Sequence, residues 1–250
     1  MFTKKTQVRL PLVRRRAGES VSEERERRVY DKLPVIVLLP FTFWCVFLVT
    51  KFQQSNAVLR QPLLWLIFAI ILTILSAISF MRLLHVARRL NLGERGELHV
   101  ADVLEELRSD GYRPIHDIVG GGFNVDHVLV GPGGIFAIET KYRGGKGEIT
   151  VRNEGVFVGD RLEEKDCLKQ ARGSAAAIKE LIHESCGKRE WVNAIVVFVG
   201  DWKIRNKWRD TNVRVFTPDR VLDYIRDQQP QLKRNEIELI ASHLQRSALA

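Results

Sequence analysis

Two long apolar runs without any charge constrain the fold of this chain more than any other feature. The first occupies residues 33–50 and reads LPVIVLLPFTFWCVFLVT, and the second occupies residues 63–81. A bilayer core about 30 Å thick is crossed by roughly 17–25 apolar residues of helix, so either run is long enough to span a membrane. We therefore expect a transmembrane helical hairpin over residues 33–82, with a pair of buried core helices as the alternative.

Basic residues bracket the two apolar runs unevenly. The N-terminal arm, residues 1–32, carries ten Lys and Arg residues, whereas the connection between the runs carries only Lys51 and Arg60. Because segments rich in Lys and Arg stay on the cytoplasmic side, both termini are expected in the cytoplasm, at the inner membrane if the cell is bacterial. The arm can lie on anionic membrane lipids, at roughly 1 kcal/mol per basic residue near the surface. Binding nucleic acid is its alternative use.

Chain length and composition narrow the remaining choices. The 250 residues and the formal net charge of +9 are enough for one compact domain beside the hairpin. The three cysteines show no Cys-x-x-Cys spacing and no clustered histidines, so neither a zinc site nor a disulfide framework is expected. Their scarcity fits a reducing cytoplasm.

Residues 91–217 show the mixed periodicities of an α/β domain. The expected order is a helix at 93–109, a strand at 112–119, a hairpin at 123–142, a basic glycine-rich loop at 143–147, a second hairpin at 148–158, a helix at 162–185, strands at 192–199 and 212–217, and closing helices at 218–226 and 231–245. Such an order places helices on both faces of a mixed sheet. The helices of residues 218–250 are expected to pack on the domain or to extend it.

The first hairpin carries the residues that point to chemistry. Two runs of β-type residues flank a Gly-Pro-Gly-Gly turn at 131–134, and a symmetric fold about that turn puts Asp126 opposite Glu139. Opposed residues have Cβ atoms roughly 4.5–5.5 Å apart, where two carboxylates repel each other. A divalent metal would compensate them, and so would Lys141, which shares the Glu139 face. A salt-bridged surface face is the alternative reading.

The motifs around this hairpin follow one another in a recognisable order. They are Gly93-x-x-Gly96-Glu97, Val125-Asp-His-Val-Leu-Val-Gly-Pro-x-Gly-Ile135, Ile138-Glu-Thr-Lys-Tyr-x-Gly144 and Lys169-Gln-Ala171. This succession closely resembles the nuclease-related domain, NERD, a branch of the PD-(D/E)xK nuclease superfamily, over roughly residues 92–216. The resemblance implies a restriction-endonuclease-like mixed sheet flanked by helices.

The resemblance also assigns a metal site and a catalytic lysine. It implies that Asp126 and Glu139 bind the metal, and that Lys141 is the catalytic lysine. Mg²⁺, or Mn²⁺ in its place, prefers oxygen ligands, and the carbonyl of Thr140 can supply a third. Lys141 can orient the attacking water or stabilise charge on the phosphate.

Three further polar residues have two readings each. By the resemblance, Glu97 is the acidic residue of the first helix, and Gln170 is the glutamine of the helix after the hairpin. Glu97 can equally be a carboxylate that favours the positive end of a helix dipole, and Gln170 a solvated helix residue. His127 points to the opposite strand face from Asp126, so it is expected to pack or hydrogen-bond and not to bind metal.

Basic and aromatic residues suggest where nucleic acid would bind. The candidates are Tyr142, Arg143, Lys146, Lys203, Arg205 and Lys207. Such side chains contact phosphates, and neighbouring Trp202 and Trp208 suit stacking on bases. A solvent-facing loop, or tryptophans placed near the membrane surface, is the alternative.

These observations predict a membrane-anchored, metal-dependent nuclease that hydrolyses phosphodiester bonds of DNA at the cytoplasmic face, with RNA as a second substrate class. The alternative is a catalytically silent nucleic-acid-binding or protein-interaction module of the same fold. Pairing of two copies to cut both strands is left open, as is the substrate's strandedness.

Overall fold

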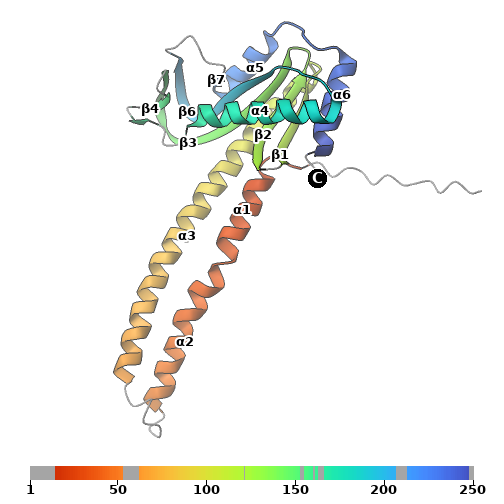
Figure 1. The fold of residues 1–250 in the computed structure, drawn as a ribbon. Helices are drawn as coiled ribbons and strands as arrows, with labels where there is room; N and C mark the ends of the chain where they lie inside the picture. The colour runs from red at the N-terminus through yellow and green to blue at the C-terminus, as the bar shows by residue number, and fades with distance from the viewer. Residues whose placement is uncertain are drawn as a thin grey trace, which may run out of the picture. The chain divides into compact units, whose positions relative to one another are not determined.

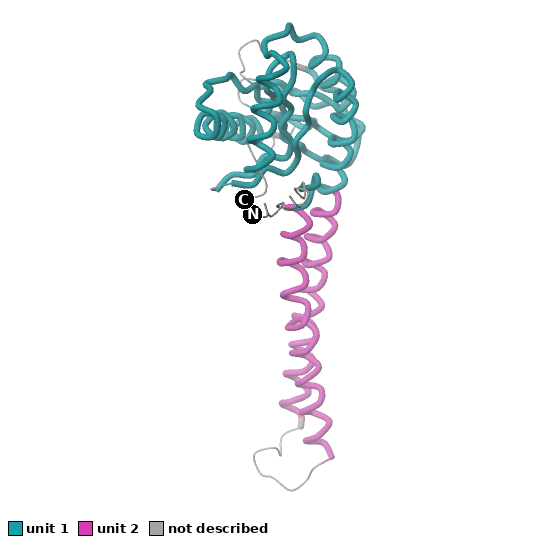
Figure 2. Tube along the Cα trace, turned by 90° about the vertical axis from the view of Figure 1, so that its right-hand side faces the viewer, with its two compact units in different colours: residues 1–19, 93–250 teal, residues 20–92 magenta. Residues whose placement is uncertain are grey.

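The computed structural model describes residues 15–52, 62–120, 122–152, 155–159, 161–162, 166–206 and 213–247. The chain divides into two compact units, which Figure 2 shows in different colours. Unit 1 comprises residues 1–19 and 93–250, and unit 2 comprises residues 20–92. The short segment before the first helix therefore belongs to the same unit as the α/β domain.

Unit 2 is helical. Its elements are α1 (Glu19–Tyr30), α2 (Leu33–Phe52) and the first part of α3 (Pro62–Glu105). Polar contacts join α2 to α3: the indole N–H of Trp44 donates to the hydroxyl of Thr73 at 3.0 Å, and the hydroxyl of Ser76 donates to the carbonyl of Ile36. The two apolar runs thus form a helical hairpin.

Two helical stretches are long and apolar enough to cross a membrane. They are Glu19–Phe52 and Leu63–Arg108, whose most apolar windows have mean hydropathies of 2.3 and 2.6. Only 6% of each window is buried by the described parts of the chain, which is unlike the core helix of a soluble protein. The apolar side chains of these two stretches are therefore mostly exposed on the described part of the chain.

The helix expected at residues 93–109 is not a separate element, which corrects the sequence analysis. Helix α3 continues without a break to Glu105, and a single 3-10 turn, η2 (Glu106–Arg108), follows. No proline lies between residues 63 and 105 to stop the helix, and the glycines within it cost only about 1 kcal/mol each. The chain turns at Gly111, whose φ of +86° suits glycine.

Unit 1 is built on a mixed sheet of seven strands within the described residues (Figure 1). The strands are β1 (Arg113–Gly120), β2 (Phe123–Gly131), β3 (Gly134–Arg152), β4 (Gly155–Val158), β5 (Arg161–Leu162), β6 (Val192–Asn206) and β7 (Val213–Phe216). Strands β1 to β5 pair antiparallel in chain order, whereas β6 lies parallel to β3 and β7 lies parallel to β6. With helices on both faces, this is the predicted restriction-endonuclease-like fold.

The β2–β3 hairpin has the register that its turn predicts. Val130 pairs with Ile135 and Val128 with Ala137, and the last pair of the ladder is His127 with Ile138. The Gly-Pro-Gly-Gly turn fixes this register because it leaves only the Gly131–Gly134 pair to close the loop.

Both faces of the central strands are buried. Val128 belongs to a cluster with Ile178 of α4 (Cys167–Cys186) and with α6 (Arg234–Ser247). Its neighbour Leu129 points the other way, into a cluster with Leu104 of α3 and with α5 (Pro218–Arg226). Successive strand residues alternate between two cores, so the strands read as nearly continuous apolar sequence.

The expected loop at residues 143–147 is instead a bulge inside one long strand. Strand β3 pairs with β6 on both sides of a register shift between Tyr142 and Lys146. Gly200 of β6 fits against this bulge at φ +139°, where an added Cβ would lie 2.3 Å from the Arg143 carbonyl oxygen. The same carbonyl accepts the indole N–H of Trp202 at 3.0 Å. Bulges of this kind redirect a strand next to a site.

Candidate active site

Three carboxylates lie in one row across the first three strands of the sheet. The β2–β3 register, extended by one pair beyond His127 and Ile138, puts Asp126 opposite Glu139. On the other side of β2, the β1–β2 ladder skips the position of Asp117 and Asp126 between the pairs His116–His127 and Ile118–Val125, and the charge of Asp117 acts on Glu97. All three are buried. A buried row of like charges needs cations close by.

Glu139, Lys141 and Gln170 form a closed polar triad. The ammonium of Lys141 donates to Oε1 of Glu139 at 2.7 Å and to Oε1 of Gln170 at 2.9 Å, and the Gln170 amide donates to the same Glu139 oxygen. Gln170 is held in place because it lies in the first turn of α4, which Asp166 caps by accepting the Lys169 N–H at 2.8 Å. The second oxygen of Glu139, Oε2, is buried without a hydrogen-bond partner among the described residues.

Asp126 is held by the backbone of the neighbouring strand. Its Oδ2 accepts the N–H of Thr140 at 2.7 Å. Burial raises the pKa of Asp126 well above its ordinary value, and the nearby Glu139 and Glu97 carboxylates raise it further. Both effects oppose the negative charge on Asp126, so a cation that entered the site would restore the ionised form.

Glu97 reaches the row from α3. Gly96 lets the helix approach β3 closely, since an added Cβ would lie 3.2 Å from Cβ of Tyr142 and 3.6 Å from Cγ2 of Thr140. Glu97 is only 7% exposed. Burial, followed by the charges of Asp117 and Glu139, raises the pKa of Glu97 to about 7. The spacing Gly93-x-x-Gly96-Glu97 therefore positions a carboxylate that titrates near neutrality.

This raised pKa predicts a pH-dependent stability difference between the protein and its Glu97→Gln variant. A glutamate in the unfolded chain titrates near 4.5, whereas native Glu97 holds its proton up to about pH 7. The stability that this difference contributes is present at low pH and is lost as pH rises from about 4.5 to about 7. Between pH 5 and pH 8 in EDTA, the free energy of unfolding of the parent should fall relative to the variant by about 2 kcal/mol. Urea titrations at both pH values measure this difference, and titrating histidines cancel because both proteins carry them. An equal difference at the two pH values would contradict the prediction.

A chain of hydrogen bonds leads from the row to the end of α3. Nε2 of His127 contacts the hydroxyl of Thr140 at 3.2 Å, and Nδ1 of His127 contacts Nδ1 of His116 at 2.9 Å. Nε2 of His116 contacts Oε1 of Glu105 at 3.2 Å. Burial lowers the pKa of both histidines, and that of His127 lies well below its ordinary value. His127 thus hydrogen-bonds on the opposite strand face from Asp126.

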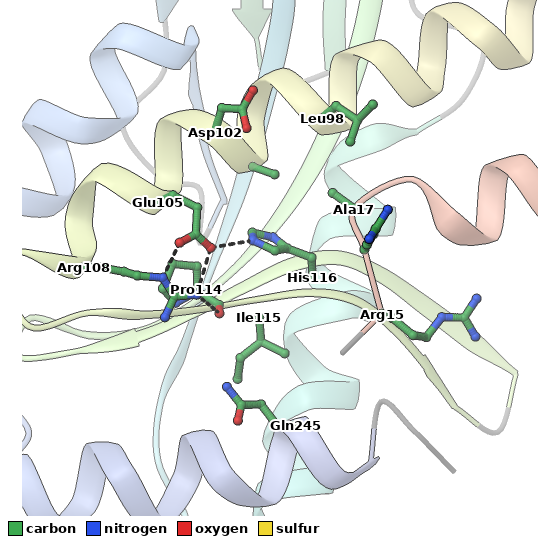
Figure 3. A pocket seen from close by; sticks show the side chains of 12 residues that line it. Arg15, Ala17, Leu98, Asp102, Glu105, Arg108, Pro114, Ile115, His116 and Gln245 are labelled. Carbon is green, nitrogen blue, oxygen red and sulfur yellow. Dashed lines mark hydrogen bonds and ion pairs between the residues drawn. The ribbon is translucent and has the colours of Figure 1, made fainter. Parts of the chain in front are cut away.

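A cavity of about 410 Å³ lies where this chain of hydrogen bonds ends, at Glu105 and His116. Figure 3 shows Glu105 between Arg108 and His116, with Arg15 and Ala17 of the N-terminal arm on another wall. Neither Asp126 nor Glu139 lines the cavity. It is therefore separate from the carboxylate row, and the row is where the chemistry-bearing side chains converge.

The candidates for nucleic-acid contact do not all lie together. Tyr142 and Arg143 are half-buried at the β3 bulge, next to Lys141. Trp202 covers Gly145 and Gly147 of the same bulge, so its ring packs against this chain and is not an open stacking platform. Lys207 and Trp208 lie outside the described residues.

The remaining basic candidates share the extension of β3 and β6 with acidic residues. Lys146 pairs in register with Asp201, and Lys203 pairs with Glu148. Arg205 forms a 2.9 Å salt bridge with the same Glu148. Lys146, Lys203 and Arg205 are exposed, but these acidic neighbours make the surface less basic than the sequence of β6 alone indicates.

The structure brings together all the residues predicted for catalysis and metal binding: Glu97, Asp126, Glu139, Thr140, Lys141 and Gln170. Residues 92–199 match the family model of the nuclease-related domain. The chain contains a nuclease-related domain. No curated protein and no solved structure gives a match.

The nuclease-related domain can be tested for its fit to a metal ion. Within the described residues, no group of three or more His, Cys, Asp or Glu side chains is arranged as a preformed metal site. The row nevertheless offers the oxygen donors that Mg²⁺ prefers, because one or two carboxylates usually suffice when water and phosphate complete the shell. The unpartnered Oε2 of Glu139 and the carboxylate of Asp126 fit this role.

Sequence reasoning missed two residues at this site, one of which lies outside the nuclease-related domain. Asp117 joins the carboxylate row, and Arg15 of the N-terminal arm pairs with it at 3.0 Å. Asp117 has a φ of +54°, a conformation rare for residues other than glycine but tolerated by aspartate. Its position depends on how β1 pairs with β2, which no local turn signal in the sequence predicts.

Proposed function

We propose that the protein is a membrane-anchored, Mg²⁺- or Mn²⁺-dependent nuclease that hydrolyses phosphodiester bonds of DNA. The observation that carries this proposal is the buried Oε2 of Glu139, which has no hydrogen-bond partner among the described residues although Lys141 and Gln170 hold the other oxygen of the same carboxylate. A buried carboxylate oxygen without a hydrogen-bond partner costs free energy unless a ligand binds it. Asp126 supports the proposal with a second buried carboxylate.

Each residue then has a defined task. Asp126, Glu139 and the Thr140 carbonyl would hold the ion, which when bound supplies Lewis-acid activation of water and neutralises phosphate charge. Lys141 donates hydrogen bonds at this place and would stabilise the charge that builds on the phosphate oxygens. Gln170 positions Lys141, and Glu97 holds or accepts a proton close to neutral pH because its pKa is about 7.

The two apolar helical stretches support anchoring in a membrane, with both termini in the cytoplasm and the N-terminal arm on anionic lipid. The exposed cations Lys146, Lys203 and Arg205, with Tyr142 and Arg143 at the bulge, would contact the phosphates of the substrate. DNA is proposed as the first substrate, and a homodimer as the form that cuts two strands.

A cleavage assay tests this function. The full chain in detergent micelles would be incubated with plasmid, single-stranded DNA and RNA, each with Mg²⁺, with Mn²⁺ and with EDTA. We expect cleavage of DNA with either metal and none in EDTA. Asp126→Asn, purified in the same way, controls for contaminating nuclease. Salt-sensitive binding without any product would favour the silent nucleic-acid-binding module, and no nucleic-acid affinity would favour a protein-interaction module.

A further inference from the structure

The N-terminal arm belongs to the site as well as to the anchor. Residues Arg15 to Glu19 come directly before the helices of unit 2, yet they belong to unit 1 with the carboxylate row. Ala17 is 7% exposed and Gly18 is buried. A basic arm that bound only to the lipid surface would not bury its backbone in the domain.

Arg15 supplies a cation to a fully buried carboxylate. Its Nε lies 3.0 Å from Oδ2 of Asp117, and the Asp117 side chain is 1% exposed whereas that of Arg15 is 22% exposed. Asp117 lies on β1 next to the part of β2 that carries Asp126, and its charge raises the pKa of Glu97. Arg15 therefore acts on the cluster that would hold the metal, two strands away from Glu139.

Gly18 connects the same arm to Glu97. Its backbone N–H donates to the Glu97 carboxylate. Gly18 has a φ of +75°, and an added Cβ would lie 3.1 Å from Cγ of Glu94, so the arm turns tightly over α3. Two nearby contacts, one side-chain and one backbone, thus tie the arm to two different carboxylates.

Arg15 adds a positive charge to a cluster of carboxylates. The cluster has four carboxylates, Glu97, Asp117, Asp126 and Glu139, and Lys141 pairs with Glu139 while Arg15 pairs with Asp117. We propose that Arg15 is a resident cation of the carboxylate cluster, delivered by the arm, that lowers the affinity of the cluster for divalent metal. This inference rests on the proposed function, because it assumes that the cluster binds metal.

The test compares four full-length proteins in micelles: the parent, Arg15→Ala, Arg16→Ala and the double variant Arg15→Ala/Asp117→Asn. Mn²⁺ binding is followed by electron paramagnetic resonance, without nucleic acid. Loss of a positive charge next to buried carboxylates should tighten Mn²⁺ binding by Arg15→Ala about tenfold. The double variant should return to the parent affinity, since the asparagine that replaces Asp117 carries no charge. Arg16 is exposed, so Arg16→Ala should bind Mn²⁺ like the parent.

Other results would overturn the inference. Equal Mn²⁺ affinities of Arg15→Ala and the parent would do so, and so would a change that Asp117→Asn does not reverse. If the parent binds no Mn²⁺ at all, the proposed metal site fails and a stability cycle decides the role of Arg15. In that cycle Arg15→Ala should destabilise the parent but not an Asp117→Asn protein, and equal destabilisation of both would reject the pairing.

Discussion

Glu139→Gln is expected to lower metal-dependent DNA cleavage by about 1000-fold or more. One oxygen of Glu139 holds Lys141 and Gln170, and the other is the buried atom proposed as a metal ligand. A carboxamide keeps the volume but removes the charge and replaces one oxygen by a hydrogen-bond donor. Initial cleavage rates at saturating Mg²⁺ measure the loss, and the Mn²⁺ dissociation constant should rise in parallel.

The matched control for this variant is Glu180→Gln. Glu180 is exposed on α4 and undergoes the same chemical change far from any proposed ligand. Its cleavage rate should stay within about twofold of the parent, as surface substitutions usually do. Undiminished cleavage by Glu139→Gln would place the activity at another site or in a contaminant.

Gly131→Ala is expected to destabilise the nuclease-related domain by about 3 kcal/mol. An added Cβ would lie 1.9 Å from Cδ1 of Tyr112. Tyr112 cannot easily move, because it is buried and its hydroxyl donates to the Ile225 carbonyl and accepts the Gly133 N–H. Hydrogen exchange of the β2 and β3 amides in the full chain measures the change.

Gly173→Ala provides the contrast within the same domain. Gly173 lies inside α4 with no heavy atom within 4 Å of an added Cβ. Alanine there should stabilise the domain by about 0.5–1 kcal/mol, since glycine is the poorer helix former. If Gly131→Ala had no more effect than Gly173→Ala, the close packing of Tyr112 on the turn would be wrong.

The parts of the site that depend on local sequence were predictable. The Gly-Pro-Gly-Gly turn determines the pairing of β2 with β3, and this pairing alone places Asp126 beside Glu139. The period of two along β3 then puts Lys141 on the face of Glu139, where the two side chains form an ion pair. The two long helices were likewise predictable, because the apolar composition of each run indicates a helix without reference to any other segment.

The parts that depend on distant segments were not predictable from local pattern. Asp117 and Arg15 are 102 residues apart, and no sequence motif predicts that they are in contact. The bulge of β3 was expected as a loop, because a basic glycine-rich segment gives the same composition in both structures. The segment is a strand because it pairs with β6. The same pairing brings Glu148 next to Arg205, so the surface is less basic than the sequence of β6 alone indicates.

The histidine chain has a consequence for proton placement. Because Glu105 accepts hydrogen bonds, neutral His116 must carry its proton on Nε2 and leave Nδ1 as an acceptor. His127 must then donate from Nδ1, so its Nε2 can only accept the hydroxyl proton of Thr140. Glu105 at one end of the chain of hydrogen bonds thus determines both histidine tautomers, and with them the direction of the Thr140 hydroxyl beside the carboxylate row.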